Sequence, residues 1–135
     1  MGKSLQFSTS TELIRVPADT VVFISADGNY STIKLADGGE YVLTQQLGQM
    51  ERRISEMVEA DDNRFVRIGK SLIINHEYVT FINPSRQKII LSDGKSFRYE
   101  VVASREALKA LKEFLETMVV EKELISPEIM EGGFK

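Results

Sequence analysis

The sequence of 135 residues has no cysteine, no tryptophan and a single histidine, His76. Without cysteine the chain can form no disulfide, no thiolate metal site and no cysteine nucleophile, and this lack fits a reducing compartment. A metal site needs three or four ligands, which one histidine with Glu77 beside it does not supply. We therefore expect His76 to lie at the surface or to cap a turn.

Long apolar stretches are also missing. No run reaches the ~18 apolar residues of a membrane span. Residues 1–10 contain one lysine and no continuous apolar stretch, unlike a secretory signal. The hydrophobic share of 42% is nonetheless enough for one packed domain. We therefore expect a single-domain cytoplasmic protein.

Sequence patterns typical of catalysis are equally scarce. No glycine-rich phosphate loop follows a predicted strand and opens a helix, and no nucleophile elbow surrounds a serine. The neighbouring acids Asp61 and Asp62 are typical of solvated charge, because a catalytic pair must converge across a cleft. The sequence contains no pattern typical of an enzyme. We therefore expect no catalytic residue, cofactor, metal or small-molecule substrate.

The net charge of −3 is distributed unevenly along the chain. Residues 64–112 hold ten lysines and arginines against four acidic residues, whereas the segments on either side are net acidic. Because a phosphate backbone responds to local potential rather than to total charge, this basic segment could face DNA. On charge alone, an ordinary solvated surface explains the segment equally well.

Apolar periodicity predicts a mainly β fold with antiparallel sheets of about seven to nine short strands and two short helices. Turn residues such as Asp27-Gly28-Asn29 and Asp93-Gly94 separate the strands. The expected strands are 13–16, 21–24, 30–35, 41–43, 65–68, 71–74, 78–82, 88–91 and 97–101. One helix follows Thr44 as its N-cap and a second follows Ser104, each with an apolar stripe at helical spacing.

Three segments are expected along the chain. Residues 1–11 are rich in serine and threonine and predict a flexible N-terminal segment. Residues 12–117 form the ordered domain, and residues 118–135 form an acidic C-terminal tail. Apolar side chains in the predicted strands are assigned to the core, namely Phe23, Phe65, Ile73, Ile74, Phe81 and Phe97.

Four stretches of the sequence together resemble a known family. Residues 64–75, Arg-Phe-Val-Arg-Ile-Gly-Lys-Ser-Leu-Ile-Ile-Asn, resemble the central signature of LytTR-type DNA-binding domains. Residues 22–30 resemble the first hairpin of that family, with its Gly-Asn-Tyr turn, and residues 43–54 resemble its first helix. Ser104 and Arg105 open the last helix as in the family. The resemblance covers about residues 12 to 117, because the four stretches follow one another at the right spacing.

The resemblance implies a bacterial transcription regulator, the output domain of a response regulator, here standing alone. It implies an elongated antiparallel β fold that binds double-stranded DNA through loops in the major groove. A homodimer on DNA and a separate signalling or membrane partner protein are compatible with it. The loops that it places near DNA contain Asn29, Ser31, Gly69, Lys70, Ser71, Ser104 and Arg105. Arg67 and Lys109 are nearby positive charges suited to phosphates, although Arg67 also fits a solvent-facing position on its strand.

The chemistry of these side chains fits such roles and also fits structural ones. Arg105 can donate two hydrogen bonds to a guanine, and Lys70 can contact a guanine or a phosphate. Asn29 fits a base contact, but a tight turn explains it as well. Ser104 is a good helix cap whatever else it does.

Two positions depart from the family pattern. Gly69 stands where a histidine is usual, and Glu106 stands where a second arginine often follows. An alternative function is therefore a β-rich protein-interaction module that derives from a LytTR domain and has lost operator binding. Gly69 and the acidic C-terminal residues favour this alternative slightly, and salt-dependent binding to duplex DNA separates the two functions.

Overall fold

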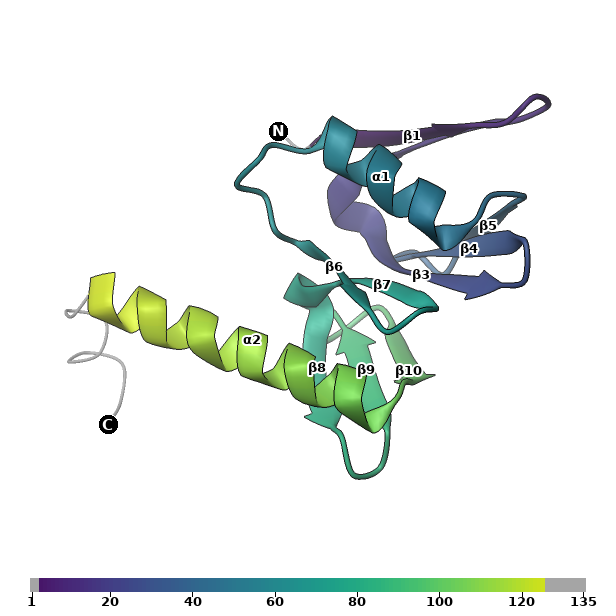
Figure 1. Ribbon diagram of the computed structural model, residues 1–135. Helices are drawn as coiled ribbons and strands as arrows, with labels where there is room; N and C mark the ends of the chain where they lie inside the picture. Colours follow the sequence, from purple (N-terminus) through teal and green to yellow (C-terminus); the bar gives the residue numbers. More distant parts are fainter. Residues whose placement is uncertain (1–2, 126–135) are drawn as a thin grey trace.

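The computed structural model describes residues 3–125, in which ten strands form three antiparallel sheets accompanied by two helices (Figure 1). This confirms the mainly β fold class. The strands are β1 Ser4–Ser8, β2 Leu13–Pro17, β3 Val21–Asp27, β4 Tyr30–Leu35, β5 Glu40–Leu43, β6 Phe65–Ile68, β7 Leu72–Asn75, β8 Val79–Asn83, β9 Lys88–Ser92 and β10 Arg98–Val102. The helices are α1 Leu47–Met57 and α2 Arg105–Ile125, with short 3₁₀ turns at Ala18–Thr20 and His76–Tyr78.

A five-stranded sheet with the order β5-β4-β3-β7-β6 forms the middle of the molecule. Its central strands β3 and β7 are buried on both faces, so their apolar residues run consecutively instead of alternating. In β7, Ile73 faces one core, while Leu72 and Ile74 face the other. The sheet therefore separates two hydrophobic cores.

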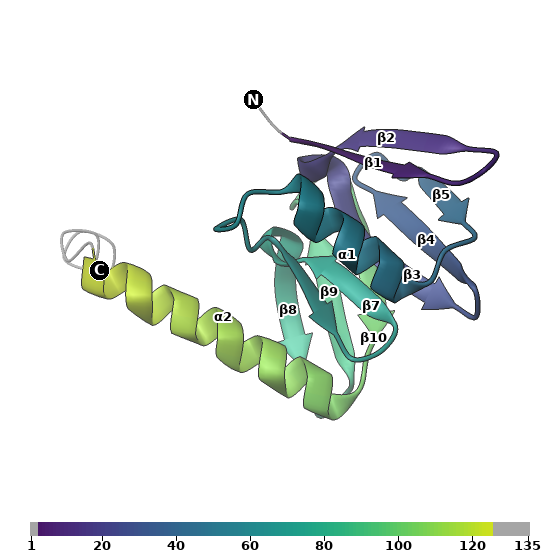
Figure 2. The ribbon, with the colours of Figure 1, turned by 45° about the horizontal axis from the view of Figure 1, so that its top comes forward.

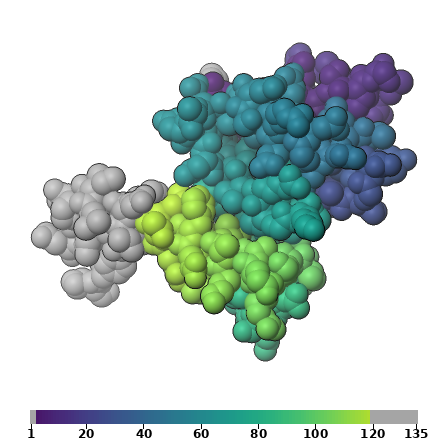
Figure 3. Space-filling view, viewed as in Figure 1, coloured from purple at the N-terminus to yellow at the C-terminus, as the bar shows by residue number. Residues whose placement is uncertain are grey.

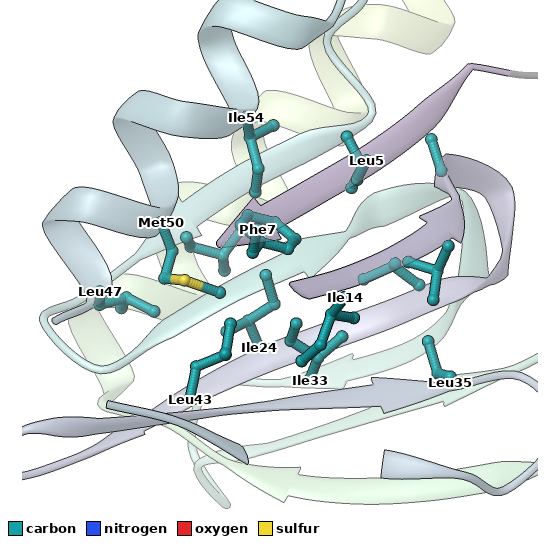
Figure 4. Packing of buried hydrophobic residues seen from close by; sticks show 14 residues of the cluster. Leu5, Phe7, Ile14, Ile24, Ile33, Leu35, Leu43, Leu47, Met50 and Ile54 are labelled. Atoms are coloured by element: carbon teal, nitrogen blue, oxygen red, sulfur yellow. The ribbon is translucent and has the colours of Figure 1, made fainter. Parts of the chain in front are cut away.

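The first core lies between this sheet and a cover formed by α1 and the β1–β2 hairpin (Figure 4). Leu47, Met50 and Ile54 of α1 are buried here, as the helical spacing predicts. Leu5 and Phe7 of β1 are completely buried in the same core. The expected flexible N-terminal segment, residues 1–11, is therefore wrong, because residues 4–8 form a strand paired with β2.

The start of α1 also differs from the expectation. The N-cap is Gln46 and not Thr44. The Gln46 backbone N–H donates to Oε1 of Gln49 at 3.0 Å, which satisfies one of the N–H groups that the first turn leaves free. A glutamine pair therefore fixes the place where the chain turns from β5 into α1.

The second core lies on the other face of the five-stranded sheet, between it, the three-stranded sheet β10-β9-β8 and α2 (Figure 2). Leu108 and Leu111 of α2 are buried in it. The Tyr99 hydroxyl donates to the Leu35 carbonyl at 2.9 Å, and the Tyr99 ring contacts Phe23 edge-on with centroids 5.4 Å apart. These contacts join the two sheets.

Phe81 does not lie in the core as expected, because its side chain is 43% exposed. An irregularity in the pairing of β8 with β9 falls between Val79 and Phe81. Such a bulge shifts the alternation of side chains, so that Phe81 points away from the second core.

The last helix is longer than expected. Because α2 continues to Ile125, the expected boundary of an acidic tail at residue 118 falls inside the helix. The rest of that segment, residues 126–135, lies outside the described residues. Within residues 3–125, no helix is both long and apolar enough to cross a membrane.

Candidate nucleic-acid interface

Three loops carry most of the residues that the resemblance places near DNA. The first is the Gly28-Asn29 turn between β3 and β4, where Gly28 has a φ of 64°. The second is the turn of residues 69–71 between β6 and β7, where Gly69 also has a φ of 64°. Positive φ favours glycine, so both turns need the residue they have. The third is Ser104 with the first turn of α2.

A hydrogen bond and a close approach bring these loops to one edge of the molecule. The Ala26 N–H, just before the first turn, donates to the Ser71 carbonyl of the second turn at 2.9 Å. A Cβ added at Gly69 would lie 3.7 Å from the Cβ of Ala107 in the first turn of α2. Figures 1 and 2 show the β3–β4 turn, the β6–β7 turn and the start of α2 in a row, and Figure 3 shows the β6–β7 surface adjoining α2.

Ser104 caps α2, and Arg105 and Lys109 project from the same helix. The Ser104 Oγ accepts from the Ala107 N–H at 3.1 Å. Arg105 and Lys109 are exposed and lie four residues apart, which places them on one face of the helix. The free N–H groups and the dipole of a helix N-terminus favour a negatively charged group in front of Ser104.

The positive charge of the basic segment 64–112 is partly balanced by neighbouring carboxylates. Four of its cations are bound to carboxylates, in the pairs Arg64–Asp62, Arg67–Glu51, Lys88–Glu100 and Lys112–Glu116. Lys88 lowers the pKa of Glu100, and Glu116 raises the pKa of Lys112. Among the residues whose side chains are described, Lys70, Arg105 and Lys109 at the loop edge have no ion pair. Of the ten cations in this segment, three therefore lie at the edge without an ion pair among the described side chains.

Ser31 occupies a different position from the one expected. Its side chain is completely buried, and its Oγ donates to the Gln45 carbonyl at 2.7 Å. The hydroxyl therefore joins β4 to the loop before α1 and is not presented to a ligand at the surface. The alternation of side chains along β4 predicts that Ser31 is buried, because Ser31, Ile33 and Leu35 share one face of the strand.

The burial of Ser31 leads to a prediction for Ser31→Ala. We expect the free energy of unfolding to fall by about 1–2 kcal/mol, because the Gln45 carbonyl loses its donor. The salt dependence of DNA binding should not change, since no charge is removed. Urea denaturation and binding titrations measure the two effects. Unchanged stability with weaker DNA binding would show instead that the hydroxyl contacts DNA directly.

The structure has a polar hollow beside Asn29 that the sequence did not predict. It is lined by Asn29, Thr44, Gln45, Gln46, Gln49 and Arg52. The start of α1 therefore adjoins the first loop and enlarges the edge. The spacing of Gln46, Gln49 and Arg52 at three residues is a signal for one helix face, but the sequence does not show that this face meets the β3–β4 turn.

The surroundings of His76 and Arg67 were not predicted from the sequence. The His76 ring is partly buried and packs edge-on against Phe114 with centroids 5.9 Å apart. Its buried Nε2 has no hydrogen-bond partner among the described residues. The turn His76–Tyr78 is capped by Asn75 and not by His76, because the Asn75 Oδ1 accepts from the Glu77 N–H at 3.1 Å. Arg67 lies on β6 beside the second loop, with its guanidinium bound to protein acceptors. No cluster of metal-ligating side chains occurs in the part of the chain that the structure describes.

An antiparallel β fold, and an edge of three loops whose cations have no ion pair among the described side chains, fit the class of small β domains that bind nucleic acid. A family model described as the LytTr DNA-binding domain matches residues 11–116. The chain belongs to this family, which confirms the resemblance seen in the sequence. Family membership supports the role of a DNA-binding regulator.

The fold is also found in a solved structure. It is the LytTr DNA-binding domain of a protein from Bacillus cereus named as a methyl-accepting/DNA response regulator. The TM-score is 0.56 at 19% sequence identity, and the match covers 85% of this chain and 98% of that chain. At this identity the likeness shows the fold. No curated protein matches the chain significantly.

Proposed function

We propose that this domain is a transcription regulator that reads a specific duplex sequence with three loops in the major groove. The observation that carries the proposal is the gathering of the loops at one edge, where the Ala26 N–H bonds the Ser71 carbonyl and Gly69 lies so near Ala107 that an added Cβ would be 3.7 Å from the Ala107 Cβ. Side chains suited to base edges and phosphates are exposed there, namely Asn29, Lys70, Ser71, Ser104, Arg105 and Lys109. The relative from Bacillus cereus, by its name, belongs to a DNA response regulator.

Different side chains have different tasks in this proposal. Arg105 donates two hydrogen bonds to guanine O6 and N7, the commonest base-specific contact. Lys109, one turn further along α2, and Lys70 bind phosphates. Asn29 and Ser71 contribute contacts that fix the register of the loops on the duplex. Gly69 contributes its φ of 64°, which shapes the turn, and no side-chain contact.

The number of unpaired cations predicts how strongly binding depends on salt. Each phosphate that a cation neutralises contributes about −0.9 to the slope of log K against log salt concentration. Lys70, Lys109 and Arg105 therefore predict a slope of roughly −2 to −3 per domain. The measurement is selection from a pool of random duplexes, followed by titration of the selected duplex at several salt concentrations.

A control variant tests whether the edge carries this dependence. Lys95 is exposed in the β9–β10 turn, at the opposite end of β10 from Ser104. The strand between them has five residues, which span about 15 Å. Lys95→Ala should keep the wild-type slope, whereas Lys70→Ala should reduce it by about 1. Absence of binding to any duplex at low salt would contradict the proposal and favour a protein-interaction module.

A further inference from the structure

Arg67 connects α1 to the turn of residues 69–71. Its Nη1 donates to Oε1 of Glu51 on α1 at 2.9 Å, and its Nη2 donates to the carbonyl of Lys70 at 3.2 Å. Both arms of the guanidinium are thus occupied by acceptors of the protein. The Arg67 side chain is 29% exposed, so much of it is covered by its neighbours.

The first turn of α1 is shaped to allow this connection. A Cβ added at Gly48 would lie 3.8 Å from Nη1 of Arg67, so the guanidinium passes close to the helix backbone. The planar fork of arginine can reach two acceptors at once, which the single ammonium group of lysine does less well. The geometry of this contact is therefore specific to arginine.

The turn is held from two sides. On one side β3 holds it through the bond from the Ala26 N–H to the Ser71 carbonyl. On the other side Arg67 holds the Lys70 carbonyl, and Glu51 holds Arg67. Two successive carbonyls of a three-residue turn are fixed in this way, and the exposed side chains of Lys70 and Ser71 extend from that fixed backbone.

The pairing with Glu51 also weakens the attraction of Arg67 for a phosphate of DNA. The positive charge of Arg67 is balanced by a carboxylate 2.9 Å away, and a phosphate that approached Arg67 would meet Glu51, which is 52% exposed. Lys70 and Arg105 have no such neighbour bound to them among the described side chains. The attraction of a phosphate to this site is therefore weaker than the presence of an arginine suggests.

We propose that Arg67 is a positioning residue, anchored by Glu51, that fixes the 69–71 turn for DNA binding and does not itself bind a phosphate. The role in DNA binding rests on the function proposed above, whereas the link between α1 and the turn does not. This assignment replaces the phosphate contact that the sequence suggested for Arg67. It means that α1, through Glu51, helps to fix the conformation of the 69–71 turn.

The test compares Arg67→Lys with Glu51→Ala, and uses Glu56→Ala as the matched control. Lysine keeps the positive charge but not the fork, so a phosphate contact would survive in Arg67→Lys and a positioning contact would not. Glu56 lies on the same helix, is exposed and pairs with Arg53, so its removal changes the net charge by the same amount. Alanine is favourable in a helix, so both α1 variants should fold.

We expect Arg67→Lys and Glu51→Ala each to weaken binding to the selected duplex by roughly tenfold relative to wild type and to Glu56→Ala. The salt slope should stay the same, and the double variant should be no weaker than the single ones. Without DNA, amide hydrogen exchange at residues 70–72 should be faster in both single variants and unchanged in Glu56→Ala.

The opposite pattern would overturn the assignment. If Arg67→Lys binds like wild type, Glu51→Ala binds more tightly than Glu56→Ala, and Arg67→Ala reduces the salt slope by about 1, then Arg67 binds a phosphate. The exchange measurement separates the two proposals. Unchanged exchange at residues 70–72 would reject the link between α1 and the turn, whereas failure of the wild-type protein to bind any duplex would reject the function.

Discussion

Arg105→Ala is expected to weaken binding to the selected duplex by about 1–3 kcal/mol, which is roughly 5- to 150-fold, and to flatten the preference at one base pair. The reason is the position of Arg105 directly after the Ser104 cap, where its exposed side chain can reach beyond the end of α2. Titration of the variant on the selected duplex and on a scrambled duplex measures both effects.

Lys109→Ala provides the comparison, because Lys109 shares the helix face but lies one turn further from the tip. We expect it to weaken the selected and the scrambled duplex about equally and to reduce the salt slope by about 1. Neither substitution removes a core side chain, so the melting temperature should stay within a few degrees. Equal losses on both duplexes for Arg105→Ala would make it a phosphate contact, and specificity would then have to come from Asn29 or Lys70.

Phe7→Ala should have the largest effect on stability. Phe7 is completely buried between the sheet and α1, and removal of such a ring lowers the free energy of unfolding by about 3–5 kcal/mol. Leu13→Ala on the paired strand is the control, because Leu13 is 56% exposed and should change stability by about 0.5 kcal/mol or less. Urea denaturation measures both. A loss for Phe7→Ala as small as that for Leu13→Ala would mean that β1 adds no stability to the fold.

The strands and helices that carry clear apolar periodicity were predictable, whereas β1 was not. In β1, Leu5 and Phe7 alternate with Ser4, Gln6 and Ser8, and two apolar residues are too few to distinguish a strand from a polar loop. The strand forms because β2 pairs with it and the first core receives its side chains. Both are tertiary effects, and the local sequence pattern of residues 4–8 does not predict them.

The position of the loops at the candidate interface was predictable, but the partners of their side chains were not. Turn residues such as Gly28 and Gly69 mark the loops in the sequence. Glu51 and Arg67, however, are 16 residues apart and meet only because α1 packs across the sheet beside β6. Ser31 is the opposite case, because its burial follows from the alternation along β4 and could have been read from the sequence.

The separation of the two cores by the five-stranded sheet has a consequence for how binding preferences can diverge between related proteins. The β3–β4 and β6–β7 turns belong to the same sheet, so the distance between them is fixed by backbone hydrogen bonds. The start of α2 is positioned by Leu108 and Leu111 in the second core. Volume changes in the first core should therefore alter stability without moving α2. Under the proposed function, substitutions in the second core should shift the start of α2 relative to the two turns, and so change the spacing of the bases that are recognised.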